Sequence, residues 1–222
     1  MSSRRFEAVL FDWDDTLCYG EPHYLVHTQT VAQRLQVEVT QQDVHQAYLH
    51  AARDGMLEPE EFYARLAHAL GVADEYHEPF REGVIDRDAV RRIFDDVLQV
   101  IDGLSKRDLK IGLLSNNVHV ALRAEALNIQ HHFDVIVSPH TYGVHKPDPR
   151  IFIETLAFMD VEPERAIYVG DSYNDDVVGA RAAGMTPVLI DRYELMVDGH
   201  DAEHYIVTLA ALDEVLERLL AS

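Results

Sequence analysis

Two aspartates, Asp12 and Asp14, stand two positions apart directly after the apolar run 8–11. Carboxylates held this close repel one another unless a cation neutralises them. A third acid, Asp171, follows another apolar run. Carboxylate oxygens favour a hard ion, most simply Mg²⁺, which keeps several waters and needs few protein ligands. The residue types therefore predict a magnesium site built from acids that follow apolar segments.

Two further apolar runs are followed by residues that suit an anion. Ser115 and Asn116 end one run, and Lys146 lies in the loop after another. A lysine and a hydroxyl beside Mg²⁺ describe a site for a phosphoryl group. At such a site an aspartate can attack phosphorus and form an aspartyl-phosphate. A neighbouring carboxylic acid can protonate the leaving oxygen and then deprotonate the water that clears the intermediate.

Short apolar segments must bring these residues together. Six of them are expected to form strands: 7–12, 109–115, 133–138, 165–170, 187–190 and 205–207. Helical periodicity marks the segments between and after the later strands: 118–128, 149–159, 174–183 and 208–220. This alternation predicts an α/β fold, a Rossmann-like parallel sheet with helices on both faces. Since ligands bind beyond the carboxyl ends of parallel strands, the polar residues at those ends are expected to meet.

The segment 19–95 interrupts this alternation. It holds no convincing strand but several helical stretches: 23–35, 41–53, 59–70 and 87–104. We interpret it as an α-helical insertion after the first strand. The chain is therefore expected to consist of an α/β core, residues 1–18 and 96–222, and an inserted α-helical domain, residues 19–95.

Four motifs give the sequence a resemblance to the haloacid dehalogenase superfamily, specifically to its phosphatase branch with an α-helical cap (phosphoglycolate-phosphatase-like). In chain order they are Asp12-Trp13-Asp14-Asp15-Thr16-Leu17, Ser115-Asn116, Lys146 before Pro147, and Gly170-Asp171-Ser172 with Asp176 downstream. Each motif follows a predicted strand, and their order matches the family. The resemblance spans the chain and makes the insertion the expected cap.

The resemblance implies a role for each residue of the first and third motifs. Asp12 is expected to be the nucleophile and a metal ligand. Asp14 is expected to be the general acid/base, with a backbone carbonyl that also contacts Mg²⁺. Thr16 is expected to orient this loop at the substrate site. Lys146 is expected to neutralise charge on the nucleophile and the phosphate.

The second and fourth motifs complete the expected site. Ser115 and Asn116 are expected to bind the phosphoryl oxygens, and Asp171 to be a metal ligand. Asp176 is expected to bind the metal through water or to position the lysine. Asp175 stands beside it, and the DxxxxD spacing that starts at Asp171 favours Asp176 as the acid that serves the metal.

One position departs from the family pattern. The family most often has glycine where Asp15 stands. This additional carboxylate either alters the metal affinity or faces solvent.

The expected function is that of a Mg²⁺-dependent phosphatase that hydrolyses a small phosphorylated metabolite through an aspartyl-phosphate. A phosphomutase of the same family retains both aspartates of the first motif and is the alternative. A 2-haloacid dehalogenase lacks the second aspartate, so Asp14 counts against that activity. A catalytically inactive binding domain on the same fold is a further alternative, since fold does not imply function. The sequence does not identify the substrate.

The composition limits the classes of partner that the protein is expected to bind. Among 222 residues, 39 acids face 19 bases, for a net charge of −20. This excess argues against binding to nucleic acid or to anionic lipid, which both need clustered cations. No apolar run reaches the ~18 residues that cross a bilayer, and the N-terminus does not resemble a signal peptide. We therefore expect a cytoplasmic monomer or homodimer whose partner is a small molecule, with neither nucleic acid nor membrane bound.

Overall fold

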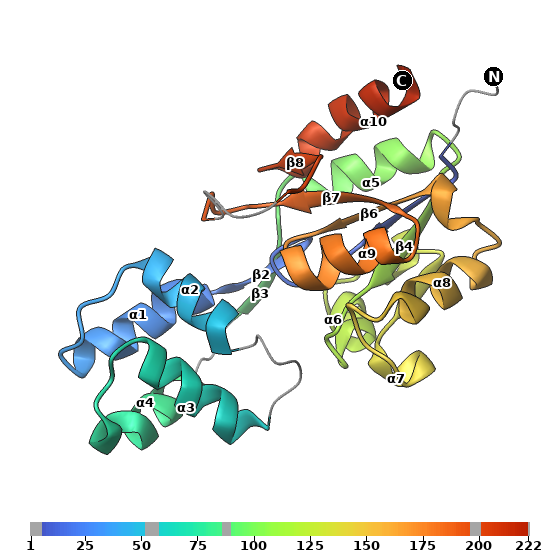
Figure 1. Cartoon of the computed structure of the whole chain (residues 1–222). Helices are drawn as coiled ribbons and strands as arrows, with labels where there is room; N and C mark the ends of the chain where they lie inside the picture. Colours follow the sequence, from blue (N-terminus) through green and yellow to red (C-terminus); the bar gives the residue numbers. More distant parts are fainter. Residues whose placement is uncertain (1–5, 52–57, 86–89, 196–200, 222) are drawn as a thin grey trace. The chain divides into compact units, whose positions relative to one another are not determined.

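The computed structural model describes residues 6–51, 58–85, 90–195 and 201–221 (Figure 1). The chain divides into two compact units, a core unit of Met1–Tyr19 with Arg92–Ser222 and a helical unit of Gly20–Arg91. These boundaries lie one and four residues from those expected from the sequence. That the helical unit acts as a cap stays a prediction.

A parallel sheet forms the centre of the core unit. In the described part of that unit, six strands pair in the order β5-β4-β1-β6-β7-β8, all parallel. They are β1 (Ala8–Phe11), β4 (Lys110–Leu114), β5 (Val135–Val137), β6 (Ala166–Gly170), β7 (Thr186–Ile190) and β8 (Tyr205–Ile206). Each lies where an apolar run predicts a strand. The chain adds β4 and β5 on one side of β1 and β6 to β8 on the other, which opens a crevice at the carboxyl ends of the central strands.

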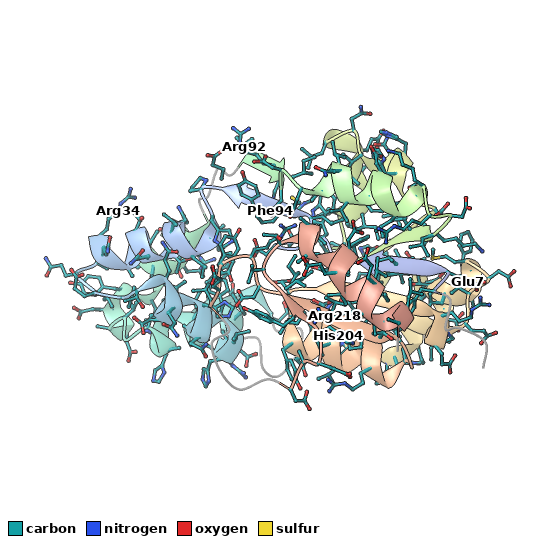
Figure 2. All side chains as sticks on the ribbon, turned by 90° about the horizontal axis from the view of Figure 1, so that it is seen from above. Glu7, Arg34, Arg92, Phe94, His204 and Arg218 are labelled. Carbon is teal, nitrogen blue, oxygen red and sulfur yellow. The ribbon has the colours of Figure 1, made fainter. Side chains whose placement is uncertain are left out.

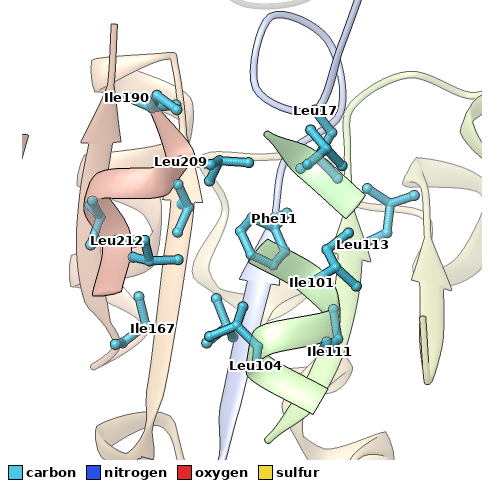
Figure 3. Packing of buried hydrophobic residues seen from close by; sticks show 14 of the residues in the cluster. Phe11, Leu17, Ile101, Leu104, Ile111, Leu113, Ile167, Ile190, Leu209 and Leu212 are labelled. Carbon is cyan, nitrogen blue, oxygen red and sulfur yellow. The ribbon is translucent and has the colours of Figure 1, made fainter. Parts of the chain in front are cut away.

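Helices cover both faces of this sheet. The described helices of the core unit are α5 (Val97–Ser105), α6 (Val120–Ala126), α7 (Pro139–Tyr142), α8 (Pro149–Phe158), α9 (Gly179–Ala182) and α10 (Leu212–Ala221). Phe11 of β1 lies with Leu104 of α5 and Leu212 of α10 in one buried cluster (Figure 3). Leu10, its neighbour, lies in a second cluster with Phe152 of α8. Because both faces are buried, the strands are continuously apolar. The predicted Rossmann-like α/β fold is confirmed.

The helical unit is built from amphipathic helices. Within residues 20–51, 58–85 and 90–91 they are α1 (Tyr24–Arg34), α2 (Gln41–Ala51), α3 (Pro59–Ala69) and α4 (His77–Ile85). Their apolar sides are buried, with Leu25, Val44, Leu66 and Phe80 fully enclosed. A capping box starts α2, because the Asp43 carboxylate accepts from the Thr40 amide at 2.8 Å and the Thr40 hydroxyl accepts from the Asp43 amide at 3.1 Å. Nowhere in the described ranges is a helix long and apolar enough to span a membrane.

The prediction of a helix over 87–104 is wrong for residues 90–96. Residues 90–93 form a strand, β3 (Val90–Ile93), which pairs with β2 (Cys18–Glu21) in a two-stranded sheet, and α5 begins only at Val97. Residues 87–89 lie outside the described residues, as do the last two positions of the helix expected over 41–53. The pairing joins segments about 70 residues apart, so helical periodicity within a short window cannot reveal it.

Candidate active site

The loop after β1 turns sharply and carries the first two acids. The Asp12 amide donates to the Val169 carbonyl at 2.9 Å, which continues the pairing of β1 with β6. The amides of Leu17 and Cys18 both donate to the Trp13 carbonyl at 3.0 Å and close the turn. Asp15 lies within it at φ 56°. This left-handed conformation favours glycine, and aspartate is among the few other residues that adopt it readily. Asp15 therefore adopts a backbone conformation that glycine would also allow.

The Asp15 side chain is half-buried and does not simply face solvent. Its Oδ1 accepts a hydrogen bond from the Tyr193 hydroxyl at 3.4 Å, and the residue lines the cleft described below. Whether Asp15 alters metal affinity stays a prediction.

Lys146 lies at the bottom of the site, only 3% exposed. Its ammonium donates to Oδ1 of Asp12 at 2.6 Å, to Oδ1 of Asp176 at 2.5 Å and to the Tyr168 hydroxyl at 2.9 Å. An ammonium has three protons, so these contacts satisfy all of them. Burial by itself lowers the pKa of Lys146, but the carboxylates of Asp12 and Asp176 raise it well above its ordinary value. The lysine is therefore held as a cation between two acids.

Three acids lie close to one another beside this one cation. Carboxylate oxygens of Asp12, Asp171 and Asp176 lie within 4.8 Å of one another. Burial raises the pKa of Asp12 to about 7, although Lys146 opposes the shift. Burial and the carboxylates of Asp12 and Asp176 raise the pKa of Asp171 well above its ordinary value. The negative charge thus exceeds what one lysine offsets, and the all-oxygen donor set fits a hard divalent ion such as Mg²⁺.

The segment after β6 is shaped to bring Asp176 into this cluster. Asp176 lies in a π-helical turn, Tyr173–Val178, and its Oδ2 accepts from the Ser172 amide at 2.8 Å. A side chain at Gly170 would place its Cβ 2.3 Å from the Asp176 carboxylate carbon, so this position requires glycine. Asp175 is not in the cluster, and its Oδ2 instead accepts from Asn116 Nδ2 at 3.3 Å.

The loop after β4 binds the lysine segment through Asn116. Its Oδ1 accepts from the Lys146 amide at 2.8 Å, and its Nδ2 donates to the Lys146 carbonyl at 3.0 Å. The Asn116 side chain therefore fixes the backbone of the lysine. Ser115 is buried beside it, and its Oγ accepts from the Asn117 amide at 3.2 Å. Phosphoryl binding by Ser115 and Asn116 stays a prediction.

Asn117 and Arg123 hold Asp14, and sequence reasoning assigned neither of them a role. Asn117 Nδ2 donates to Oδ2 of Asp14 at 2.7 Å, and a guanidinium nitrogen of Arg123 lies 3.6 Å from Oδ1 of Asp14. Tyr168, which binds Lys146, was also missed. Its only sequence signal is a phenol within an otherwise aliphatic buried strand.

These groups line a cleft of about 320 Å³ at the carboxyl edge of the sheet. Its lining residues are Asp12, Asp14, Asp15, Ser115, Asn116, Asn117, Lys146, Asp171, Ser172, Asp175 and Asp176. Of the eight residues expected in the site, only Thr16 is absent from this lining. Its side chain is fully buried, and within the described residues its hydroxyl has no hydrogen-bond partner. Its carbonyl accepts two hydrogen bonds from Arg192, at 2.8 and 3.2 Å.

Known proteins resemble this chain in sequence. Haloacid dehalogenase-like hydrolase domain-containing protein 3 of Bos taurus is 33% identical over 136 residues, which cover 59% of this chain and 54% of that protein. The glyceraldehyde 3-phosphate phosphatase of Methanopyrus kandleri is 30% identical over 198 residues, 84% of each protein. Several curated relatives, the bovine protein among them, are matched over only 54–60% of their own length.

A solved structure and a family model also match this chain. The crystal structure of a predicted phosphoglycolate phosphatase from Haemophilus somnus 129pt superposes with a TM-score of 0.67 over 97% of this chain and 100% of that chain. At 16% sequence identity this likeness shows the fold alone. The model of the haloacid dehalogenase-like hydrolases matches residues 6–184, most of the chain. The chain therefore belongs to the haloacid dehalogenase-like hydrolase family.

Proposed function

We propose that this protein is a Mg²⁺-dependent phosphatase that hydrolyses a small phosphorylated metabolite through an aspartyl-phosphate on Asp12. The observation that carries the proposal is the Lys146 ammonium, which joins Asp12 and Asp176 inside a cluster of three carboxylates. The similarity to a glyceraldehyde 3-phosphate phosphatase adds support, because its substrate is a small phosphate monoester.

Asp12 is the nucleophile in this proposal. One of its carboxylate oxygens forms a bond to phosphorus while the bond between phosphorus and the ester oxygen breaks. Water then attacks the phosphorus of the aspartyl-phosphate, which releases inorganic phosphate and regenerates the carboxylate. Asp12 and Lys146 are held against each other at 2.6 Å, so the attacking group is oriented before the substrate arrives.

Asp14 is the proton donor and acceptor. It gives a proton to the leaving oxygen and later takes one from the attacking water. Its carboxylate is anchored by Asn117 at 2.7 Å, and Arg123 lies 3.6 Å away. These contacts come from the loop after β4 and from α6, whereas Asp12 pairs with Lys146, so the two aspartates of the first motif have different partners and different roles.

The metal site fits the same scheme. Asp12, Asp171 and Asp176 would hold Mg²⁺, with the backbone carbonyl of Asp14 as a further ligand. When bound, Mg²⁺ supplies positive charge that offsets the carboxylates and the phosphoryl oxygens. Lys146 adds to that charge from its buried position and opposes the rise in the pKa of Asp12 that burial causes.

We assign substrate choice to the helical unit Gly20–Arg91, acting as a cap. The cleft of the core unit is lined by carboxylates, amides, hydroxyls and one lysine. Such groups recognise a phosphoryl group and its metal, and no aliphatic or aromatic residue is among these lining residues to bind the rest of a metabolite. We retain a cytoplasmic location and a monomer or homodimer as predictions, in keeping with the net charge of −20.

A panel of phosphate monoesters tests the proposal. The purified chain is incubated with each compound, with and without Mg²⁺, and inorganic phosphate is measured together with the organic product. We expect Mg²⁺-dependent phosphate release, lost in Asp12→Asn and kept in Arg165→Met, whose side chain pairs with Glu7 away from the cleft. Isomerised substrate without phosphate release would make the protein a mutase. No reaction with any monoester would leave a binding domain as the better account.

A further inference from the structure

Arg192 is a buried cation outside the cleft. It follows the end of β7 by two residues, its side chain is 4% exposed, and it does not line the cleft. Burying a guanidinium is unfavourable unless its donors are satisfied. Its partners therefore indicate what the residue does in this fold.

The guanidinium makes contacts on each of its sides. Its Nε and Nη2 both donate to the Thr16 carbonyl, at 3.2 and 2.8 Å, and its Nη1 donates to Oδ2 of Asp96 at 2.8 Å. The guanidinium carbon lies 4.1 Å from the centre of the Phe94 ring. Phe94, which is labelled in Figure 2, is the residue directly after β3. The planar, forked side chain of arginine can donate in two directions and also stack on a ring.

The Thr16 carbonyl ends the loop that carries both catalytic aspartates. Asp12 begins this loop, where it is fixed by the pairing of β1 with β6. At the far end Arg192 holds the Thr16 carbonyl, and the Phe94 amide donates to the Leu17 carbonyl at 3.1 Å. Asp14 lies between these two fixed ends. A displacement of about 1 Å at a reacting group can lower a rate ~10²-fold, so fixing both ends matters for proton transfer.

The same cation reaches the segment that returns from the helical unit. Phe94 and Asp96 follow β3, and Oδ2 of Asp96 also accepts from the Leu209 amide at 2.8 Å. Arg192 thus connects three stretches of the core unit: the loop 12–16 that carries Asp12 and Asp14, residues 94–96 after β3, and the end of β7.

We propose that Arg192 is a positioning residue: by holding the Thr16 carbonyl, it keeps Asp14 oriented to protonate the leaving oxygen. Phe94 and Asp96 fix the guanidinium in place for this task. The inference rests on the proposed phosphatase function, and it predicts that Arg192 acts on the proton-transfer step more than on phosphoryl binding.

The test compares two leaving groups in Arg192→Met and Arg192→Lys. 4-Nitrophenolate is a weak base and leaves without a proton, whereas the alkoxide of glycerol phosphate needs one. We expect kcat for glycerol phosphate to fall at least about ten-fold more than kcat for 4-nitrophenyl phosphate in Arg192→Met, as a partial loss of the ~10²–10⁴-fold that a general acid contributes. Arg192→Lys keeps a donor but not the forked guanidinium, so the difference in kcat between the two substrates should be smaller. Should Arg192→Met fail to fold, Arg192→Lys carries the same comparison.

A structural role alone would scale both rates equally, because it changes only the fraction of folded protein. Arg165→Met, which removes a half-exposed ion pair with Glu7, is the matched control and should leave the ratio of the two rates unchanged. Hydrogen exchange supplies a readout without catalysis. In Arg192→Met the amides of Leu17 and Cys18 should exchange faster, with those of β6 unchanged.

Equal losses on the two substrates, or unchanged exchange at Leu17 and Cys18, would overturn the inference. A wild-type protein inactive on every phosphate would instead contradict the proposed function. The exchange measurement would then still decide whether Arg192 holds the loop, so the two failures are distinguishable.

Discussion

The Lys146 ammonium lies 2.6 Å from Oδ1 of Asp12, and both side chains are almost wholly buried. The two residues are 134 positions apart and meet where the loops after β1 and β5 reach the same edge of the sheet. Lys146 also binds Asp176, so one cation joins the proposed nucleophile to an acid of the proposed metal site.

Lys146→Met should abolish most activity and also destabilise the fold. It removes the cation that two buried carboxylates share, and breaking a buried pair costs about 3–5 kcal/mol. The loss of electrostatic stabilisation should lower kcat by about 10²–10³ or more. Urea unfolding and steady-state kinetics measure the two effects, with Lys106→Met on the surface as control. Unchanged stability at neutral pH would contradict the shared-cation arrangement.

Asp14→Asn should separate proton transfer from phosphoryl transfer. Asparagine has a similar shape but cannot donate the proton, so kcat for an alkyl phosphate should fall about 10²–10⁴-fold. The first step with 4-nitrophenyl phosphate should persist, while hydrolysis of the phosphoenzyme slows. Burst kinetics measure both steps, with the exposed Asp102→Asn as control. Equal losses on both esters would exclude the acid/base role.

Gly170→Ala should damage the metal site while keeping the core. Its Cβ would lie 2.3 Å from the Asp176 carboxylate carbon, so Asp176 must move out of the cluster. We expect weaker Mg²⁺ binding and a loss of about 1–3 kcal/mol from overpacking. Gly103→Ala is the matched control: nothing lies within 4 Å of a Cβ there, and α5 should gain about 0.5–1 kcal/mol. Calorimetric Mg²⁺ titration and thermal unfolding report the difference. Wild-type Mg²⁺ affinity in Gly170→Ala would show that Asp176 does not serve the metal.

Mg²⁺ binding should release protons below about pH 7. Burial raises the pKa of Asp12 from 3.8 to about 7, so the metal-free protein retains a proton that an ionised ligand must lose. In the metal-free protein the folded state holds more protons than the unfolded state between these values, so this group makes stability fall as pH rises from about 4 to 7. Stabilisation by Mg²⁺ should therefore grow over the same range. Titration calorimetry in buffers of different ionisation enthalpy counts the protons, and heats that are independent of buffer at pH 6 would contradict the prediction.

The sequence predicts the strands and the acids at their ends, because both depend on local patterns. Continuous apolar runs indicate β1, β4 and β6, and Asp12, Ser115 and Asp171 follow them directly. Parallel pairing then brings these ends together by topology alone. The acidic cluster of Asp12, Asp171 and Asp176 can therefore be predicted from the sequence.

The contacts that orient these groups could not be predicted in this way. Asn117 and Asp14 are 103 positions apart, and Arg192 and Thr16 are 176 apart. Such pairs depend on side-chain directions across loops, which no periodicity encodes. The strand pair β2 and β3 was missed for the same reason, since its pairing lies between distant segments. Thr16 shows the converse: Arg192 donates to its carbonyl, whereas its hydroxyl has no hydrogen-bond partner within the described residues, and its expected role of orienting the loop stays a prediction.

The most direct test of the account is to trap the covalent intermediate. Asp14→Asn is mixed with 4-nitrophenyl phosphate and Mg²⁺, quenched in acid within milliseconds to seconds, and digested for mass spectrometry. We predict a phosphoryl group on Asp12, sensitive to hydroxylamine as an acyl phosphate is, and absent when Asp12→Asn is added to the same chain. Phosphate release without any phosphorylated aspartate, or with the label on a residue other than Asp12, would contradict the nucleophile assignment.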